Sequence, residues 1–482
     1  MAHLRGHTGS QRLNGIHGRN LIVSKLRYNK PFVYLISGRT VTNLGDSLFV
    51  VAAMWLIYEL TGSAAYTGLA GFFIQAPRSL RFLAGPFVDR WRTRRILIAT
   101  QLVNGALMAI LPLAAVTGFL SVWTILVILP LINFVNQFVY PAQHKALPMI
   151  VEDAHLVRAN SIFSMAGQAT NMVFNAVGGV LIALVGTAAL FAFNSLTFFL
   201  AAMLFAGVVI QHSTGPDSDS APDSASDSAP DPDSDSAPGS DVDTPSETAA
   251  TPDSDSPESN DEADDESKTA AYVRELRAGI QYIRGSTLML LVIGVMGGNF
   301  AVGALLAVLP AFAALLGGPE VYGLLLSALA GGTLAGSLGA SFLEDVPFGW
   351  LIAASLIISG LCLIATVLAP FLLLTIGLFL LVFVPFGVFN VTTWAMIQSA
   401  VDESMLGRVT STVTSVSFIM APVGSLIGGS GGEFIGITTI IIATAVVLVG
   451  LGVYFLARPQ IRLLPKVETI DEHTLDLGTH DP

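Results

Sequence analysis

The sequence predicts an all-α integral membrane protein with twelve transmembrane helices, arranged as two parallel six-helix halves. Only 12% of the residues are charged and 52% are hydrophobic, whereas soluble domains carry about 25% charged residues. Uncharged apolar runs recur from residue 32 to residue 457, and several exceed the roughly 20 residues that a membrane-spanning helix needs. A β-barrel is disfavoured because its strands are alternating segments of about 10 residues.

Twelve apolar runs define the expected spans. Those of the N-terminal half, residues 32–210, are 32–60, 65–88, 96–118, 121–141, 160–184 and 187–210. Those of the C-terminal half, residues 286–457, are 286–316, 321–342, 347–369, 371–397, 409–433 and 435–457. The first and seventh runs are long enough to tilt or bend in the bilayer.

Polar segments flank and join the halves. Residues 1–31 and 458–482 are expected to be cytoplasmic tails, the first of them disordered. Residues 211–270 form an acidic linker, rich in Asp, Ser, Ala and Pro, that has too little apolar surface to fold. Residues 271–285 have apolar positions at helical spacing with arginines among them, which predicts an interfacial amphipathic helix.

The net charge of −12 comes from the linker. Residues 215–267 contain 14 Asp and 4 Glu and no Lys or Arg. The acidic balance therefore gives no indication of a nucleic-acid partner, and none is expected. The Asp-rich composition is also typical of salt-loving prokaryotes, which makes a halophilic source one interpretation.

The Lys and Arg residues predict the orientation. With both termini in the cytoplasm, every Lys and Arg outside the spans falls in a cytoplasmic tail or loop, and no external loop contains one. This distribution satisfies the positive-inside rule. It favours twelve spans with both termini cytoplasmic.

The halves also resemble each other in sequence. Residues 151–161 align without gaps to residues 401–411, and the same offset carries Gly178-Gly179 onto Gly428-Gly429. A duplicated unit joined by a long linker is the layout of transporters built from two parallel halves.

Residues 85–95 read GPFVDRWRTRR. This segment resembles the signature of the loop between the second and third spans in the major facilitator superfamily. Four further stretches resemble the macrolide-efflux and siderophore-exporter branch: Asn43–Asp46, Tyr58–Gly62, Pro141–Gln143 and Gly407–Val409. The resemblance covers residues 32–457 and implies a secondary transporter.

The same resemblance implies a conformational latch at the cytoplasmic end of the second span. Its members would be Gly85, Asp89, Arg90, Arg94 and Arg408. Asp89 is an anion whose positively charged partners must release it when the halves move apart, and Arg408 lies in the other half. The alternative is that Asp89 and the arginines only anchor the loop.

Asp46 is an acidic residue deep in the first span, roughly 20 Å from Phe32 at 1.5 Å per residue. Charge at that depth costs on the order of 3 kcal/mol, so Asp46 is expected to face the interior. Arg78 and Arg81, on one face of the second span, are possible partners. The pair would bind a proton during transport or form a permanent salt bridge, and the arginines would alternatively bind an anionic cargo.

Uncharged polar residues are candidates for lining a central cavity. They are Asn136, Asn171 and Asn175 in the first half and Asn390 and Trp394 in the second. The alternative for these side chains is hydrogen bonding and packing between helices, at around 0.6 kcal/mol per bond.

Catalysis and cofactors have no support in the sequence. There is no nucleotide-binding Gly-x-x-x-x-Gly-Lys loop, no cluster with metal-ligand spacing, and only one cysteine, Cys362. We therefore expect no cofactor or metal. The resemblance to the superfamily implies a prokaryotic plasma-membrane protein, expected to be monomeric, that exports small amphipathic molecules using the proton gradient. The alternatives are an importer or flippase of siderophore-like or lipid-like cargo and a non-transporting membrane sensor.

Overall fold

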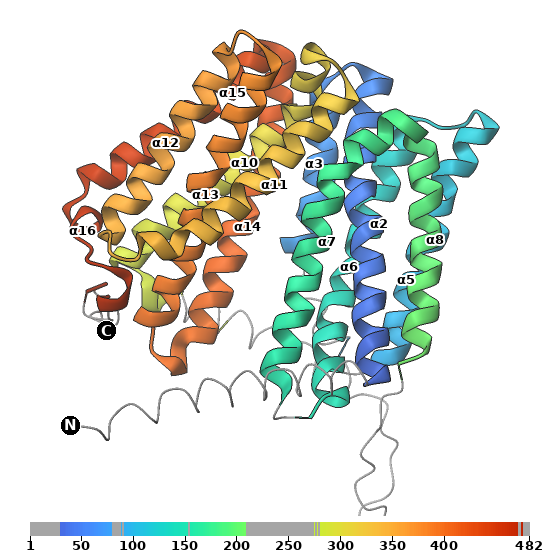
Figure 1. Ribbon diagram of the computed structural model, residues 1–482, viewed down its shortest axis with the longest axis horizontal. Coiled ribbons are helices and arrows are strands. Elements are labelled where there is room, and N and C mark those ends of the chain that lie inside the picture. Colours follow the sequence, from blue (N-terminus) through green and yellow to red (C-terminus); the bar gives the residue numbers. More distant parts are fainter. Residues whose placement is uncertain are drawn as a thin grey trace, which may run out of the picture.

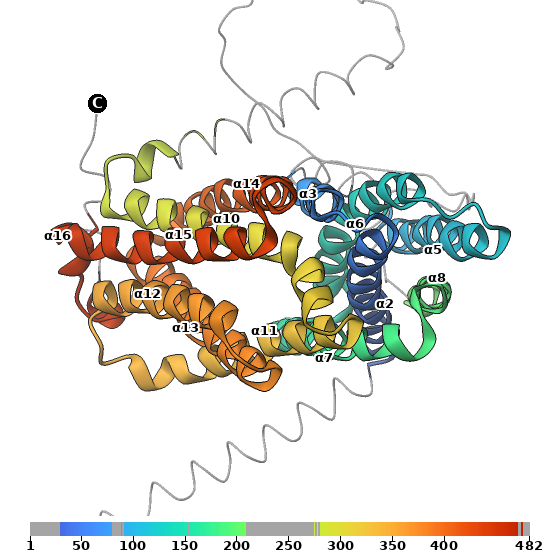
Figure 2. The same ribbon diagram turned by 90° about the horizontal axis from the view of Figure 1, so that it is seen from above.

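The structure is a computed structural model that describes residues 29–79, 88, 91–152, 155–208, 274, 277, 280–470 and 474–475. Two groups of long helices lie side by side, α2 to α8 and α10 to α16 (Figures 1 and 2). The first group comprises α2 (Lys30–Thr61), α3 (Ala64–Ser79), α5 (Thr93–Thr117), α6 (Val122–Ile150), α7 (Leu156–Val185) and α8 (Thr187–Ala206).

The second group repeats this succession. It comprises α10 (Thr287–Leu316), α11 (Pro319–Gly339), α12 (Phe348–Leu368), α13 (Leu372–Ala400), α14 (Glu403–Ile435) and α15 (Ile437–Ala457), with the short helices η3 (Ala340–Leu343), α16 (Pro459–Arg462) and η4 (Val467–Thr469).

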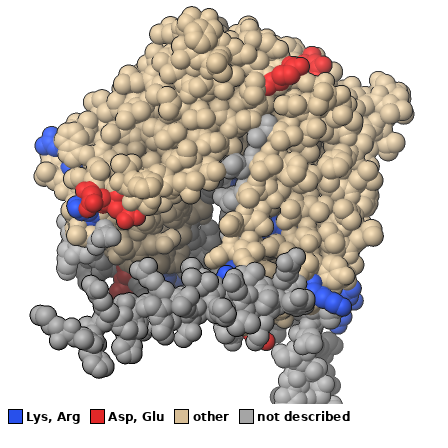
Figure 3. Space-filling model, in the orientation of Figure 1, with Lys and Arg blue, Asp and Glu red and all other residues tan. Residues whose placement is uncertain are grey.

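Ten of the described helices are long and apolar enough to cross a membrane. They are all the long helices above except α3 and α7, and α3 is described over 16 residues only. A broad uncharged surface covers the face of the molecule in Figure 3, with charged side chains gathered near its ends. These features confirm a multi-helix membrane protein.

Local signals account for where several helices begin and end. The Asn29 side chain accepts a hydrogen bond from the Phe32 backbone N–H and caps the start of α2. Ser121 and Ser286 cap α6 and α10 in the same way. Gly62 ends α2 in the left-handed conformation, and its N–H donates to the Tyr58 carbonyl.

The two groups pack by the same scheme, which agrees with the internal duplication. Within the first group, α2 packs against α7 and α8, and α5 packs against α6 and α8. Their counterparts in the second group make the same pairs: α10 with α14 and α15, and α12 with α13 and α15. Gly186 and Gly436, which are 250 residues apart, both have positive φ angles between consecutive long helices.

The groups meet through two equivalent helix pairs, α3 with α14 and α7 with α11 (Figure 2). Glycines permit both contacts. A Cβ atom on Gly68 would lie 2.7 Å from the Gly429 Cα, and one on Gly179 would overlap the Gly323 backbone. Because no side chain separates the chains there, the helices approach at backbone distance.

These contacts belong to the end of the molecule opposite the chain termini, where the groups converge in Figure 1. Ser63 donates a hydrogen bond to Glu433 (2.8 Å), and Thr67 donates one to the Ala307 carbonyl (2.6 Å). Trp55 also stacks on Tyr322, with ring centroids 5.9 Å apart. The two groups diverge toward the end that carries the termini.

The segment after α15 folds back onto the second group. The Leu475 carbonyl accepts from the N–H of Thr287 at the start of α10, and the Pro465 carbonyl accepts from the N–H of Phe348 at the start of α12. Lys466 forms a 2.6 Å salt bridge with Asp345. This segment therefore satisfies N–H groups that a helix leaves unpaired at its first turn.

Candidate functional site

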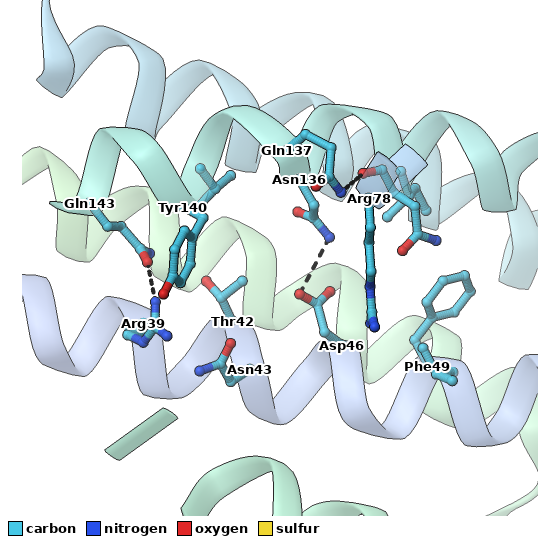
Figure 4. A pocket seen from close by; sticks show the side chains of 14 residues that line it. Arg39, Thr42, Asn43, Asp46, Phe49, Arg78, Asn136, Gln137, Tyr140 and Gln143 are labelled. Carbon is cyan, nitrogen blue, oxygen red and sulfur yellow. Dashed lines mark hydrogen bonds between the residues drawn. The ribbon is translucent and has the colours of Figure 1, made fainter. Parts of the chain in front are cut away.

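A cavity of about 530 Å³ lies among α2, α3 and α6 (Figure 4). One face of α2 supplies residues at intervals of three and four: Arg39, Asn43, Asp46 and Val50. This spacing places them above one another on one side of a helix. The wall from α6 follows the same rule; its members are Asn133, Asn136, Gln137, Tyr140 and Gln143.

Asp46 is the acidic side chain among the described lining residues. Its Oδ2 accepts a hydrogen bond of 3.4 Å from Asn136, whose own carbonyl accepts one of 2.7 Å from Asn104 on α5. Three helices are thus linked through one chain of polar groups. The second carboxylate oxygen, Oδ1, is buried without a hydrogen-bond partner among the described residues.

Arg78 enters the cavity from α3 and lies close enough to Asp46 for the two charges to interact. The expected proximity of these two groups is therefore present, while the hydrogen bond to Asp46 comes from Asn136. Arg81, the other partner expected from the sequence, lies outside the described residues.

Arg39 is a charged residue of the cavity that was not selected from the sequence. Its Nη1 donates a 2.6 Å hydrogen bond to Gln143 Oε1. Its guanidinium lies 4.3 Å from the centroid of the Phe163 ring and 5.5 Å from that of Tyr140, within the range of cation–π attraction. The available signal was its position seven residues before Asp46, two turns along the same helix face.

A second, smaller pocket of about 200 Å³ adjoins the first and shares Val50 and Arg78 with it. Its wall is mostly apolar and comes from both groups of helices. The first group contributes Met54 and Ile74, among others, and the second contributes Leu306, Leu326 and Tyr322.

Of the five residues expected to line a cavity, the structure places one, Asn136, in the larger cavity. Asn171 and Asn175 lie on α7, and their side chains are outside the described part of the chain. Asn390 and Trp394 of α13 border neither pocket: Asn390 is exposed, and Trp394 packs against the hydrophobic core.

Two members of the expected latch can be located. Arg94 donates to the carbonyl of Ala206 in the last turn of α8, and Arg408 is exposed, with its guanidinium 3.6 Å from the Met405 sulfur. Gly85, Asp89 and Arg90 lie outside the described residues. Beside them, Lys145 of α6 donates a 3.0 Å hydrogen bond to the Val88 carbonyl.

The fold and site define a class: a polytopic membrane protein built from two similar helical groups, with a polar, charged cavity in the first group, which is the layout of a secondary transporter. The profile described as Major Facilitator Superfamily matches residues 35–425. The chain belongs to this superfamily of membrane transporters.

Similar proteins agree with this assignment. An uncharacterised MFS-type transporter of Bacillus subtilis, YvqJ, is 22% identical over 91% of this chain and 95% of its own length. The multidrug efflux pump Tap of Mycobacterium bovis is 22% identical over 90% and 94%, respectively. Macrolide efflux protein A of Streptococcus pyogenes is 25% identical over a shorter stretch, 27% of this chain and 34% of its own.

Among solved structures, a bacterial homologue of the human lysosomal transporter Spinster, inward-facing and unoccupied, superposes with a TM-score of 0.62. It is 14% identical, and the match covers 89% of this chain and 97% of that one. This likeness supports the fold. The relatives above are bacterial, and they lend no support to a halophilic source.

Proposed function

We propose that this protein is a secondary active transporter of the plasma membrane that exports small amphipathic molecules in exchange for protons. The observation that carries the proposal is the cavity among α2, α3 and α6, which holds the Asp46 carboxyl group near Arg78, with Arg39 further along the same wall, in a membrane-embedded bundle. The likeness to efflux proteins supports the direction.

The proposed topology has twelve spans. In the first group α3 and α7 are the second and fifth of six long helices, and they correspond to α11 and α14, which are the second and fifth of the other group. Basic residues support cytoplasmic termini. Lys30, Arg95, Arg408 and Arg458 lie at helix ends on the side of the termini, whereas the described residues at the opposite ends include no Lys or Arg. This asymmetry is what the positive-inside rule describes.

Transport would proceed by rocking of the two groups about the central cavity. In the present state the groups are joined at the external end by α3 with α14 and α7 with α11. Opening that end requires the Ser63–Glu433 hydrogen bond and the Trp55–Tyr322 stack to separate. The cavity would then be accessible from the outside instead of from the cytoplasm.

Asp46 is the proposed proton carrier. A carboxylate at membrane depth is costly, so a change in its surroundings during rocking shifts the balance between its charged and protonated forms. Asn136 donates a hydrogen bond to the Asp46 carboxyl group, and Arg78 lines the same cavity. Movement of α3 relative to α2 would alter that support and release or take up the proton.

The proposed latch has two roles compatible with its contacts. Arg94 is engaged with the end of α8, where a cation favourably meets the negative end of the helix dipole. This contact supports the anchoring role, while Arg408, exposed at the start of α14, is free to meet Asp89 when the groups close.

The test is uptake by inside-out vesicles of a panel of amphipathic fluorescent probes, with and without an acidic interior. We expect accumulation that depends on the pH gradient for the wild type and not for vesicles lacking the protein. Absence of gradient-dependent movement for every probe, with folded protein in the membrane, would reject proton-coupled export. Gradient-driven movement in the opposite direction would establish the importer instead.

A further inference from the structure

We propose that the polar cavity and the adjoining apolar pocket form one binding site for an amphipathic anion. Its carboxylate would meet Arg78, with the charge of Arg39 two helix turns further along the same cavity, and its apolar body would lie in the pocket between the two helix groups. This inference rests on the proposed transport function and specifies the substrate class of the same site.

The charge of the cavity favours an anion. Its described lining contains two arginines and one carboxylate, so it carries a net positive charge while Asp46 is ionised. Arginine presents a planar fork of donors that matches a carboxylate. In a low-dielectric site, such charge-assisted hydrogen bonds are the stronger ones.

The positively charged guanidinium of Arg39 contacts only uncharged groups among the described residues. In the described part of the chain its guanidinium contacts an amide, Gln143, and two aromatic rings. Its Nε is buried without a hydrogen-bond partner among the described residues, as is Asn43 Nδ2 one turn further along α2. Both atoms lie against Gly167 of α7, so they are not donors to a ligand in the cavity. What favours an anion there is the positive charge of the guanidinium, which lines the cavity wall.

The apolar pocket offers space for the body of the ligand. Arg78 and Val50 belong to both cavities, so a ligand whose head lies at Arg78 can continue directly into the apolar space. The wall there includes Met54 of the first helix group and Leu306, Leu326 and Tyr322 of the second. The ligand body would therefore contact both groups, which connects binding with their relative movement.

An amphipathic cation fits the same site poorly. It would pair with Asp46 while lying near the guanidinium groups of Arg39 and Arg78, and like charges in a low-dielectric site repel strongly. Neutralising Asp46 should therefore change the affinities for an anionic and a cationic ligand in opposite directions.

Binding to the purified full-length protein in detergent provides the test, by calorimetric titration with three naphthalene probes. These are 2-naphthylacetate, 2-(2-naphthyl)ethylamine and 2-(2-naphthyl)ethanol, which are anionic, cationic and neutral. We expect the anion to bind at least about tenfold more tightly than the cation, which corresponds to about 1.4 kcal/mol. Tighter binding of the cation would overturn the proposal.

Variants locate the head group. Arg39→Gln and Arg78→Gln are each expected to weaken binding of the anion about tenfold, whereas Arg462→Gln, the same change on the exposed short helix α16, should leave it unchanged. Asp46→Asn should strengthen anion binding and weaken cation binding. A damaged fold weakens both, so this opposite response separates charge from misfolding. Unchanged anion affinity in both cavity arginine variants would contradict the proposal.

Leu326→Trp tests the body of the ligand, because a larger side chain fills the apolar pocket. The variant should weaken the binding of 2-naphthylacetate. It should leave unchanged the binding of acetate, which has the same head group and no apolar body, measured by competition. The titrations use no gradient, so the two proposals can fail separately. Anion binding without gradient-driven transport would refute the proposed function alone, and gradient-driven export with preferential cation binding would refute the substrate class alone.

Discussion

At the scale of single residues, Asp46 is the group on which proton coupling would depend. Asp46→Asn keeps the size of the side chain and removes its ability to ionise. We expect the variant to lose accumulation driven by a pH gradient while it retains exchange of labelled for unlabelled substrate, which needs no net proton movement. Vesicle assays of both activities provide the measurement.

Asp345→Asn is the matched control for that experiment, since it neutralises a carboxylate at the molecular surface far from the cavity. It should transport as the wild type does. Gradient-driven accumulation by Asp46→Asn at the wild-type rate would show that Asp46 has only a structural role.

The chain from Asn104 through Asn136 to Asp46 makes a prediction about stability. Asn136→Ala leaves two buried groups without their partner, at a cost of about 1–3 kcal/mol for each typical unsatisfied group. We expect a lower midpoint of thermal unfolding in detergent. Asn133→Ala, whose amide bonds to its own helix, should change the midpoint less.

A double variant provides the independent check. If Asn104 and Asn136 act through one network, the effects of Asn104→Ala and Asn136→Ala on unfolding are smaller together than their sum. Strict additivity would mean that the two amides do not cooperate.

The candidate site could be predicted from the sequence only in part. Asp46 and Arg78 are conspicuous as charges inside apolar runs, and both line the cavity. Arg39 carries the same signal, but the sequence does not show which groups it contacts. Its contacts, Gln143 and Phe163, lie more than 100 residues away along the chain. Asn390 and Trp394 border neither of the two pockets described above, and a position on a helix does not by itself give the direction in which a side chain points.

At the scale of helices, the hydropathy pattern located each long helix but not its ends. The expected span 121–141 is part of a helix that continues to Ile150, and the expected span 409–433 lies in a helix that begins at Glu403. Hydropathy marks the part of a helix that lies in lipid. The polar turns beyond it are held by backbone hydrogen bonds and by packing, which composition does not report.

The close contact of α7 with α11 predicts how a small substitution acts at long range. Gly179→Ala introduces a methyl group into the Gly323 backbone in the present state. We expect it to disfavour this state and shift the population toward one that is open at the external end. Accessibility of a cysteine placed at Thr67, in a Cys362→Ser background, should rise toward a membrane-impermeant thiol reagent.

Gly377→Ala serves as the control, since a Cβ atom there meets no neighbour within 4 Å. Equal cysteine accessibility in the two glycine variants would show that the α7–α11 contact does not determine the state of the external end.

The salt bridge between Lys466 and Asp345 makes a prediction about pH. The hydrogen bond from Lys466, aided by its charge, lowers the pKa of the Asp345 carboxyl from its usual value. A carboxyl with a lowered pKa stabilises the fold above its ordinary pKa of about 3.9 and loses that effect as the pH falls through the folded value. The unfolding midpoints of wild type and Asp345→Asn should differ at pH 7 and converge below pH 3.9.

The difference should be small and should shrink in high salt, because both groups are exposed and solvent screens such pairs. A difference that persists below that pH would assign the effect of Asp345→Asn to something other than its charge.

At the scale of the whole molecule, the two helix groups would act as bodies joined at the external end in this state. Ser63→Cys with Glu433→Cys, in a Cys362→Ser background, places two thiols where a 2.8 Å hydrogen bond now lies. A short bis-methanethiosulfonate reagent, which forms a disulfide with each thiol and releases sulfinate, should join them and stop transport, because the external end could no longer open. Cleavage with a reductant should restore it.

Each single-cysteine protein treated with the same reagent is the control and should remain active. Full transport by the cross-linked protein would exclude a movement that separates Ser63 from Glu433.

The placement of the charged cavity on α2, α3 and α6 has a consequence for how such a protein changes over generations. After a gene duplication both copies carry the same polar positions, yet here the described charged lining belongs to one copy. The other copy is then free to drift at those positions as long as its packing surfaces persist. New cargo preferences can therefore arise from few substitutions in the first 150 residues, and a laboratory selection for altered cargo is best concentrated there.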